Sequence, residues 1–346
     1  MKAVVKTSHG PGHLELKDIA RPVLKENEVL VQIIYAGLCG SDMHMYNWVS
    51  VSESAKKHFP GVFGHEYVGR VVETGRAALG LQVGDIVAGE THLPCGQCQM
   101  CRIGEQHNCQ NYKFVLGSWV EYMAVPAVCA VKIPADLPLK LAAILEPCGV
   151  AVHALQAVDI RGESIAVVGC GPIGLAAIVF AGAMGAGKIF AVELNASRQA
   201  MAKNLGATVV YDPRSADVAE NVLAQTDGYG VTFVFDFSGS PAAVPAALLY
   251  TRRGGEVVIG GIPEKPLPID AGLLIRREIG LQGIFGRHMF KTWRTMNSLL
   301  ASGRVNPAAL LSLVTHVLPL AHFEKGIHLV KSLEAVKVLL EVIKEP

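Results

Sequence analysis

The chain has 346 residues, of which 51% are hydrophobic, and its 31 Lys and Arg residues nearly balance its 30 Asp and Glu residues. A chain of this length predicts two domains with sizeable cores, since a domain typically has about 100–200 residues. The balanced charge excludes the strongly basic surface expected of a protein that binds nucleic acid or an anionic membrane.

The cysteines and the first residues bear on where the protein works. Four of the eight cysteines are closely spaced in a metal-like pattern, which argues against a disulfide framework. Met1–Val5 has the pattern of a strand rather than of a signal peptide. The uncharged run 164–187 contains glycines and a proline in a strand–turn–helix order, which argues against a membrane span. We therefore expect a cytoplasmic protein.

The first part of the chain predicts a compact β unit. Short β-type runs alternate there with Gly and Pro, as in antiparallel folds. The predicted strands are Met1–Lys6, Leu14–Lys17, Glu28–Ile34, Glu66–Glu73 and Asp85–Ala88.

Two short stretches of this β unit carry candidate metal ligands. Cys39 is followed by Gly40, and the pair His65-Glu66 follows Gly64, so small residues leave room for close approach. Cys, His and Glu all bind zinc, and three protein ligands with one open position are typical of a catalytic zinc. The alternative is that Cys39 is a small buried residue and His65 an ordinary turn histidine.

A second group of cysteines follows. Cys95, Cys98, Cys101 and Cys109 have the spacing C-x2-C-x2-C-x7-C, which predicts a closed tetrahedral zinc site. An iron–sulfur cluster is the competing interpretation, but the bacterial ferredoxin pattern would continue with C-x3-C-P. We favour a structural zinc that holds a loop poor in apolar residues.

A dinucleotide motif lies near the middle of the chain. The strand Ser164–Val168 is followed by Gly169-Cys170-Gly171-Pro172-Ile173-Gly174 and then by an apolar helix. Gly residues at these positions allow a tight turn, close approach of a pyrophosphate and close packing of helix on strand. The next strand ends at Glu193, whose carboxylate can bind ribose hydroxyls and would repel a 2′-phosphate. The motif therefore favours NAD over NADP, and an ordinary βαβ turn is the alternative.

Alternating strands and Ala-rich helices surround this motif and predict a doubly wound parallel sheet. The six predicted strands are Ser164–Val168, Lys188–Val192, Thr208–Tyr211, Phe233–Phe237, Glu256–Ile259 and Leu281–Ile284. The helices between them include Ala196–Leu205 and Ala242–Leu249. After Gly286 we expect the chain to return to the β unit and to end with the strand Val336–Val342.

Together these motifs resemble those of the zinc-dependent medium-chain alcohol dehydrogenases, in the right order and over essentially the whole chain. The matching motifs are Gly64-His65-Glu66-x-x-Gly69, the four-cysteine lobe and the Gly169–Gly174 turn. The resemblance implies an α/β fold: a mainly β GroES-like catalytic domain with a structural zinc lobe, and a Rossmann sheet. The implied boundaries are residues 1–150 for the catalytic domain, 151–286 for the NAD-binding domain and 287–346 for the segment that returns to the catalytic domain.

The resemblance also implies roles for individual residues. Cys39, His65 and Glu66 would hold a catalytic zinc, with Glu146 near or on the metal. Ser41 and His44 would relay the substrate proton to solvent. The residues implied for NAD are Gly169, Gly171, Ile173, Gly174, Glu193, Arg198, Gly261, Ile262, Ile284 and Phe285. Two zinc ions per chain and a homotetramer would complete the enzyme.

Three stretches are most similar to the threonine dehydrogenase branch of this family: Met43–Trp48, Gly89–His92 and Gly283–Trp293. This similarity implies oxidation of the secondary alcohol of L-threonine to 2-amino-3-oxobutyrate, with hydride transfer to NAD. His92 and Arg287 are candidates to hold the amino and carboxylate groups of the substrate, and a purely structural role is the alternative for each.

Some features favour a different substrate. Glu146-Pro147 is typical of polyol dehydrogenases, and the segment 110–121 is shorter than the matching loop of threonine dehydrogenases. A polyol or 2,3-butanediol dehydrogenase is therefore the alternative. A non-enzymatic, crystallin-like relative is disfavoured because such proteins often lose the metal ligands that this chain keeps.

Overall fold

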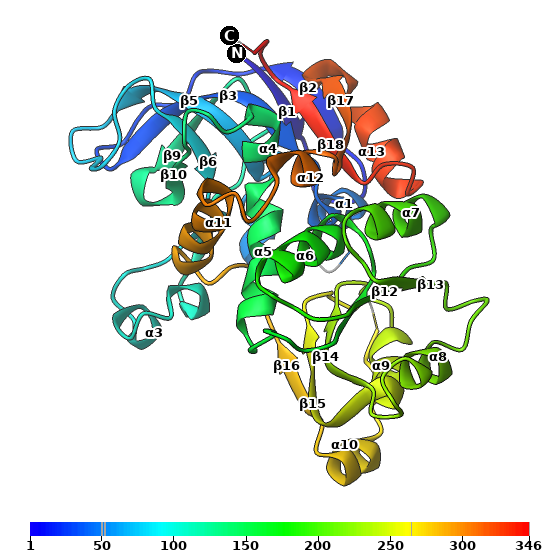
Figure 1. Ribbon diagram of the computed structural model, residues 1–346. Coiled ribbons are helices and arrows are strands. Elements are labelled where there is room, and N and C mark those ends of the chain that lie inside the picture. Colours follow the sequence, from blue (N-terminus) through cyan, green and yellow to red (C-terminus); the bar gives the residue numbers. More distant parts are fainter. Residues whose placement is uncertain (50, 52, 264, 346) are drawn as a thin grey trace. The chain divides into compact units, whose positions relative to one another are not determined.

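The computed structural model describes residues 1–49, 51, 53–263 and 265–345. They form two compact units, one made of Met1–Glu146 with Leu311–Pro346 and the other of Pro147–Leu310. The expected fold class is confirmed: the first unit is mainly β and the second contains a parallel sheet covered by helices (Figure 1). No helix in the described part of the chain is long and apolar enough to span a membrane.

The first unit is built around a seven-stranded sheet of order β10-β6-β5-β3-β18-β17, with β9 also paired to β3. A three-stranded sheet, β2-β1-β4, and the pair β7-β8 complete its β structure. The strands are β1 Lys2–Lys6, β2 Leu14–Asp18, β3 Glu28–Gly37, β4 Gly61–Val62, β5 Glu66–Thr74, β6 Ile86–Gly89, β7 His92–Leu93, β8 Lys113–Phe114, β9 Tyr122–Pro126, β10 Ala130–Lys132, β17 Val314–Pro319 and β18 Lys337–Glu341.

Short helices connect these strands. They are α1 Gly40–Asn47, α2 Glu53–Lys56, α3 Gln99–Arg102, α4 Leu139–Ala142 and α13 Phe323–Lys331, with 3₁₀ turns at Gln106–Asn108, Ala127–Cys129 and Leu320–His322.

Strand β3 is the centre of this unit because nearly all of its residues are buried on both faces. It pairs antiparallel with β5 and with β18, and Gly37 at its end lies opposite both Glu66 and Leu339. The strand signals of the first unit are confirmed for β1, β2, β3, β5, β6 and β18. Among the strands that were not predicted is β17, which runs parallel to β18 with α13 connecting the two.

The second unit contains the doubly wound sheet, with strand order β13-β12-β11-β14-β15-β16 and parallel pairing throughout. Its strands are β11 Ile165–Val168, β12 Ile189–Val192, β13 Val209–Tyr211, β14 Val231–Asp236, β15 Thr251–Ile259 and β16 Gly280–Gly283. Its helices are α6 Pro172–Ala183, α7 Ala196–Asn204, α8 Val218–Ala224, α9 Ala243–Tyr250, α10 Ala271–Arg277 and α11 Lys291–Ala301, while α5 Leu145–Gln156 and α12 Pro307–Leu311 lie at its boundaries. All six predicted strands are confirmed.

The chain returns to the first unit later than the expected residue 287. Residues 287–310 group with the second unit, because Arg287, which precedes α11, and Met296 of α11 both pack on Gly149 of α5. A Cβ built on Gly149 would lie 2.5 Å from Cδ of Arg287 and 3.4 Å from Cε of Met296. The chain therefore rejoins the first unit at Leu311.

Candidate functional site

The first candidate site, here called the Cys39 cluster, consists of Cys39, His65 and Glu66. One ligand atom from each lies within 4.8 Å of the others. The antiparallel register explains why: Gly37 pairs with Glu66, so the residues just after β3 and just before β5 meet at one end of the sheet. Thiolate, imidazole and carboxylate are all zinc donors, so the donor set fits a catalytic metal site.

Asp42 contacts two residues of this cluster, His65 and Cys39. Its carboxylate is fully buried, and Oδ1 lies 3.2 Å from Nδ1 of His65. Its Oδ2 accepts the backbone N–H of Cys39 at 2.9 Å. Burial opposes a charged imidazole, but the neighbouring Asp42 carboxylate raises the pKa of His65 well above its ordinary value. A carboxylate placed behind one ring nitrogen leaves the other nitrogen to face a metal.

Two further buried contacts hold the carboxylates of Glu66 and Glu146 in place. Lys337 donates to both oxygens of Glu66, at 2.7 and 2.6 Å. Burial opposes the charge on Lys337, yet the Glu66 carboxylate raises the pKa of this lysine above its ordinary value. The hydroxyl of Thr91 donates to Oε1 of Glu146 at 2.6 Å. All of these groups are at most 7% exposed.

Ser41 and His44 both lie on helix α1, which begins directly after Cys39. Ser41 is exposed and His44 is half-buried. Positions three apart share one face of a helix, so the two side chains are neighbours there. In the described part of the chain, however, no hydrogen bond joins their side chains.

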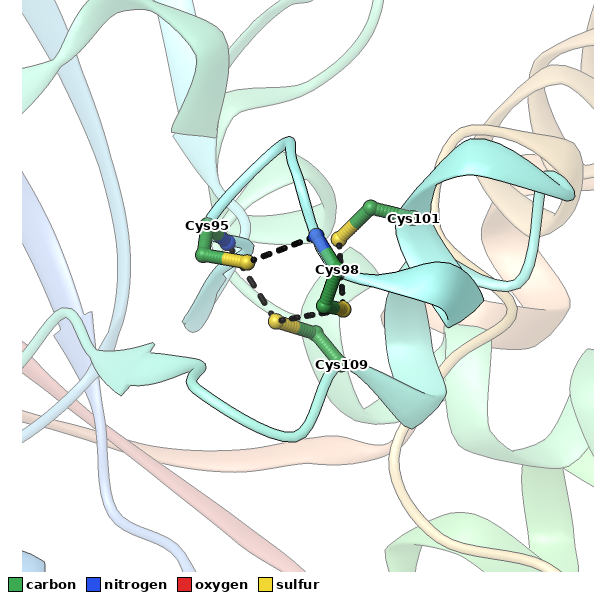
Figure 2. Close-up of side chains that lie close together, drawn as sticks. All are labelled: Cys95, Cys98, Cys101 and Cys109. Atoms are coloured by element: carbon green, nitrogen blue, oxygen red, sulfur yellow. Dashed lines mark hydrogen bonds between the residues drawn. The ribbon is translucent and has the colours of Figure 1, made fainter.

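The second candidate site is the four-cysteine lobe (Figure 2). Ligand atoms of Cys95, Cys98, Cys101 and Cys109 all lie within 4.8 Å of one another, and none of these thiols forms a disulfide. Sγ of Cys98 is 3.5 Å from Sγ of Cys101 and 3.8 Å from Sγ of Cys109. Tetrahedral zinc with bonds of about 2.3 Å would place neighbouring sulfurs about 3.8 Å apart, so the geometry fits zinc.

Backbone groups in the lobe favour thiolates, which are the form that binds metal. The N–H of Cys98 points to Sγ of Cys95 at 3.4 Å, and the N–H groups of Cys95 and Asn111 point to Sγ of Cys109. Hydrogen bonds from backbone N–H groups, that of Cys101 first, lower the pKa of Cys98 to about 6, whereas burial raises the pKa of Cys101 to about 12. A cation bound among the four sulfurs would favour the thiolate of Cys101 as well.

The third candidate site is the turn between β11 and α6 in the second unit. Gly169 has φ +82°, a conformation that favours glycine, and a Cβ on it would lie 2.7 Å from Cα of Ser238. A Cβ on Gly174 would lie 2.0 Å from the carbonyl oxygen of Gly169. At Gly171, by contrast, a Cβ would meet nothing within 4 Å. The turn is thus tight at both ends and open in the middle, as pyrophosphate binding requires.

Glu193, after β12, closes one side of this turn. Its Oε2 accepts the N–H of Cys170 at 2.7 Å, while Oε1 accepts the N–H groups of Leu194 and Asn195 at 2.8 Å each. Burial and the charge of Glu193 raise the pKa of Cys170 to about 12, against the influence of Arg198. The charges of Glu193 and Arg198 therefore both influence the turn at Cys170. The Glu193 carboxylate also holds the backbone of the turn by accepting the N–H of Cys170.

The other residues implied for the dinucleotide follow the neighbouring parallel strands. Gly261 and Ile262 come after β15, and Ile284 and Phe285 come after β16. The N–H groups of Gly260 and Gly261 both donate to the carbonyl of Asp236 at the end of β14. These segments lie at the carboxyl edge of one parallel sheet, and the strand order reverses between β11 and β14, where such sheets bind ligands.

His92 and Arg287 lie in different units and are both buried. His92 contacts Glu90 and packs against the rings of Tyr112 and Phe114 at 5.2 and 5.3 Å. Arg287 is 1% exposed and its side chain covers Gly149.

Sequence reasoning missed three supporting residues, Asp42, Thr91 and Lys337. Asp42 carried a usable signal, because it lies three residues after Cys39 at the start of a helix. Thr91 and Lys337 carried none, because their partners lie 55 and 271 residues away.

Comparisons with known proteins find relatives that match nearly the whole chain. The family model of the alcohol dehydrogenase GroES-like domain matches residues 25–135, and that of zinc-binding dehydrogenases matches residues 172–302. The L-threonine 3-dehydrogenase of Bacillus velezensis is 41% identical, over 98% of each chain. The solved alcohol dehydrogenase TADH from Thermus sp. ATN1 is 31% identical, covers 99% of this chain and 100% of its own, and has a TM-score of 0.89. The solved 2R,3R-butanediol dehydrogenase from Bacillus subtilis is 29% identical, covers 99% of both chains and has a TM-score of 0.87.

Proposed function

This chain belongs to the zinc-binding alcohol dehydrogenase family, and from that premise we propose that it is an L-threonine 3-dehydrogenase. It would oxidise the secondary alcohol of L-threonine to 2-amino-3-oxobutyrate and transfer the hydride to NAD. The observation that carries the proposal is the intact Cys39 cluster, in a chain that matches threonine dehydrogenases over nearly its full length.

We propose that each chain binds two zinc ions. Cys39 and His65 would hold the catalytic ion together with Glu66 or Glu146, and the four-cysteine lobe would hold a structural ion. A bound zinc would lower the pKa of the substrate hydroxyl from about 16 toward about 7.

The chain's own residues would then move the proton. The hydroxyl of Ser41 would accept the substrate proton and pass it to His44, and His44 would release it to solvent. An imidazole can gain and lose a proton near neutral pH, which suits this step. The position of both residues on α1, directly after Cys39, supports the assignment.

NAD would bind at the carboxyl edge of the parallel sheet. Gly171 would let the pyrophosphate approach the start of α6, Gly169 and Gly174 would keep the turn tight, and Ile173 would contact NAD. Glu193 would accept a ribose hydroxyl and repel a 2′-phosphate, which favours NAD over NADP. Arg198 would lie beside the adenosine half, and Gly261, Ile262, Ile284 and Phe285 would line the nicotinamide half.

The amino and carboxylate ends of threonine would each need a polar partner in the protein. His92 and Arg287 are our candidates for this role, and neither is assigned to a particular end. A second candidate function, oxidation of 2,3-butanediol or a polyol, is favoured by Glu146-Pro147 and by the short segment 110–121.

We propose a homotetramer in the cytoplasm. Strand β16 is the edge of the parallel sheet and all four of its residues are exposed, so it offers unpaired backbone groups to a second copy. The eight cysteines form no disulfide in the described part of the chain, which suits a reducing compartment.

The decisive experiment measures NAD reduction with L-threonine, sorbitol and 2,3-butanediol side by side. We expect turnover with L-threonine and formation of the amino ketone product. Efficient turnover of a diol and none of threonine would reject the proposed substrate and support the second candidate.

A further inference from the structure

Lys337 makes an unusually complete set of contacts beside the Cys39 cluster. Its Nζ donates to Oε1 and Oε2 of Glu66 at 2.7 and 2.6 Å, and to the carbonyl of Leu38 at 2.9 Å. An ammonium group has three donors, so these three contacts satisfy it fully. Lys337 is 2% exposed and Glu66 is fully buried, so water does not weaken the pair.

The fold brings the two residues together across the end of β3. Gly37 pairs with Glu66 of β5 on one side and with Leu339 of β18 on the other. Gly37 must lack a side chain here, because a Cβ on it would lie 2.0 Å from Oε2 of Glu66. The Glu66 carboxylate therefore lies over Gly37 and within reach of Lys337.

Both oxygens of Glu66 are thus engaged by an ammonium group at the same place where a metal would bind Cys39 and His65. An ammonium group and a metal ion attract the same oxygen lone pairs, so they compete for the carboxylate.

We propose that Lys337 is a positioning residue that restrains Glu66 from binding the metal as a full ligand. By holding both carboxylate oxygens, it keeps one coordination position available to the substrate hydroxyl. This inference rests on the proposed metal site, and it adds a role for a residue 271 positions away from Glu66 in the sequence.

The test observes the metal directly. Zinc is kept in the four-cysteine lobe, Co(II) is placed in the Cys39 cluster, and imidazole is added as a probe of the open coordination position. The visible absorption of Co(II) reports when imidazole binds. The proteins compared are the wild type, Lys337→Met, Glu66→Gln, the double variant of both, and Lys344→Met as a control with an exposed lysine.

We expect the wild type, Glu66→Gln and Lys344→Met to bind imidazole equally well, because Glu66 does not fill the open position in any of them. In Lys337→Met the released carboxylate occupies that position. Imidazole should then bind about tenfold more weakly, and a chelator should remove Co(II) about tenfold more slowly. The double variant should bind imidazole as Glu66→Gln does.

Equal imidazole affinity in Lys337→Met and the wild type would overturn the inference. A gain of about tenfold in Glu66→Gln would do the same, because it would show that Glu66 already fills the position. If Lys337→Met does not fold, Lys337→Gln keeps a donor without the charge and should weaken imidazole binding in the same direction. None of these readouts depends on threonine, so a failure of the proposed substrate and a failure of this inference are distinguishable.

Discussion

Asp42 joins two residues of the Cys39 cluster through one buried carboxylate. Its Oδ1 lies 3.2 Å from Nδ1 of His65, and its Oδ2 accepts the backbone N–H of Cys39 at 2.9 Å. The side chain is fully buried, and it lies at the start of α1, three residues after Cys39. The geometry of the imidazole and the thiol therefore depends on the same group.

We expect Asp42→Asn to weaken metal binding at the Cys39 cluster by about 10- to 100-fold. The amide can still accept from Cys39, but its NH₂ group would then face His65 and favour the wrong imidazole tautomer. Competition with a chelator measures the metal affinity, and Asp136→Asn in an exposed loop is the control. Unchanged affinity in Asp42→Asn would mean that Asp42 only caps the helix.

The zinc content tests the four-cysteine lobe separately. Cys98→Ser removes one of four converging thiols, and we expect the protein to retain one zinc instead of two, since a closed site needs all four ligands. The lobe should also become sensitive to proteases, because binding of a structural zinc is coupled to folding. Cys148→Ser changes a buried thiol outside both clusters and should retain two zincs. Equal zinc content in both variants would contradict the assignment.

The sequence pointed to both groups of candidate metal ligands because their signals are local, and the structure brings the members of each group together. His65-Glu66 and the cysteine spacing are visible within a few residues, and the β3–β5 register then brings Cys39 to them. The contact between Lys337 and Glu66 could not be predicted in the same way. It exists only because β18 pairs with β3 after the chain has passed through the second unit, and no local pattern encodes that pairing.

For the fold as well, features with local sequence signals could be predicted and features that depend on distant contacts could not. Strands β11 to β16 alternate with helices, and all but β16 carry apolar runs, so their positions were predictable. The boundary at residue 287 was not, because Arg287 and Met296 stay with the second unit through their packing on Gly149. A contact of this kind depends on how α11 and the segment before it pack against α5, and no turn signal encodes it.

The glycines of the dinucleotide turn give a matched pair of variants. At Gly174 a methyl group would collide with the carbonyl of Gly169, so we expect Gly174→Ala to lower the free energy of unfolding by about 1–3 kcal/mol. At Gly171 a methyl group meets nothing within 4 Å, so Gly171→Ala should fold normally. It should nevertheless bind NAD weakly, because the methyl group would stand where the pyrophosphate approaches.

Thermal unfolding and NAD titration of both variants separate packing from binding. If Gly171→Ala bound NAD as tightly as the wild type, this result would contradict the proposed NAD site. Destabilisation by Gly171→Ala would instead show that the middle of the turn is packed.

Asp236 places a buried carboxylate at the end of β14. Burial raises its pKa above the ordinary value for aspartate, although hydrogen bonds from the N–H and hydroxyl of Ser238 act in the opposite direction. A raised pKa means that the folded protein holds this proton more tightly than the unfolded chain does. The corresponding stabilisation is fully present below the unfolded pKa of about 3.9, and it is lost as the pH rises through the folded pKa.

The ionised form of Asp236 is therefore a buried charge that costs stability. In Asp236→Asn the amide oxygen can still accept both hydrogen bonds from Ser238, while the buried charge is absent. We expect this variant to unfold at a higher temperature than the wild type at neutral pH, and the difference to shrink as the pH falls toward 4. Thermal unfolding across this pH range measures both effects. A variant that is less stable than the wild type at neutral pH would show that the charge itself is needed at the end of β14.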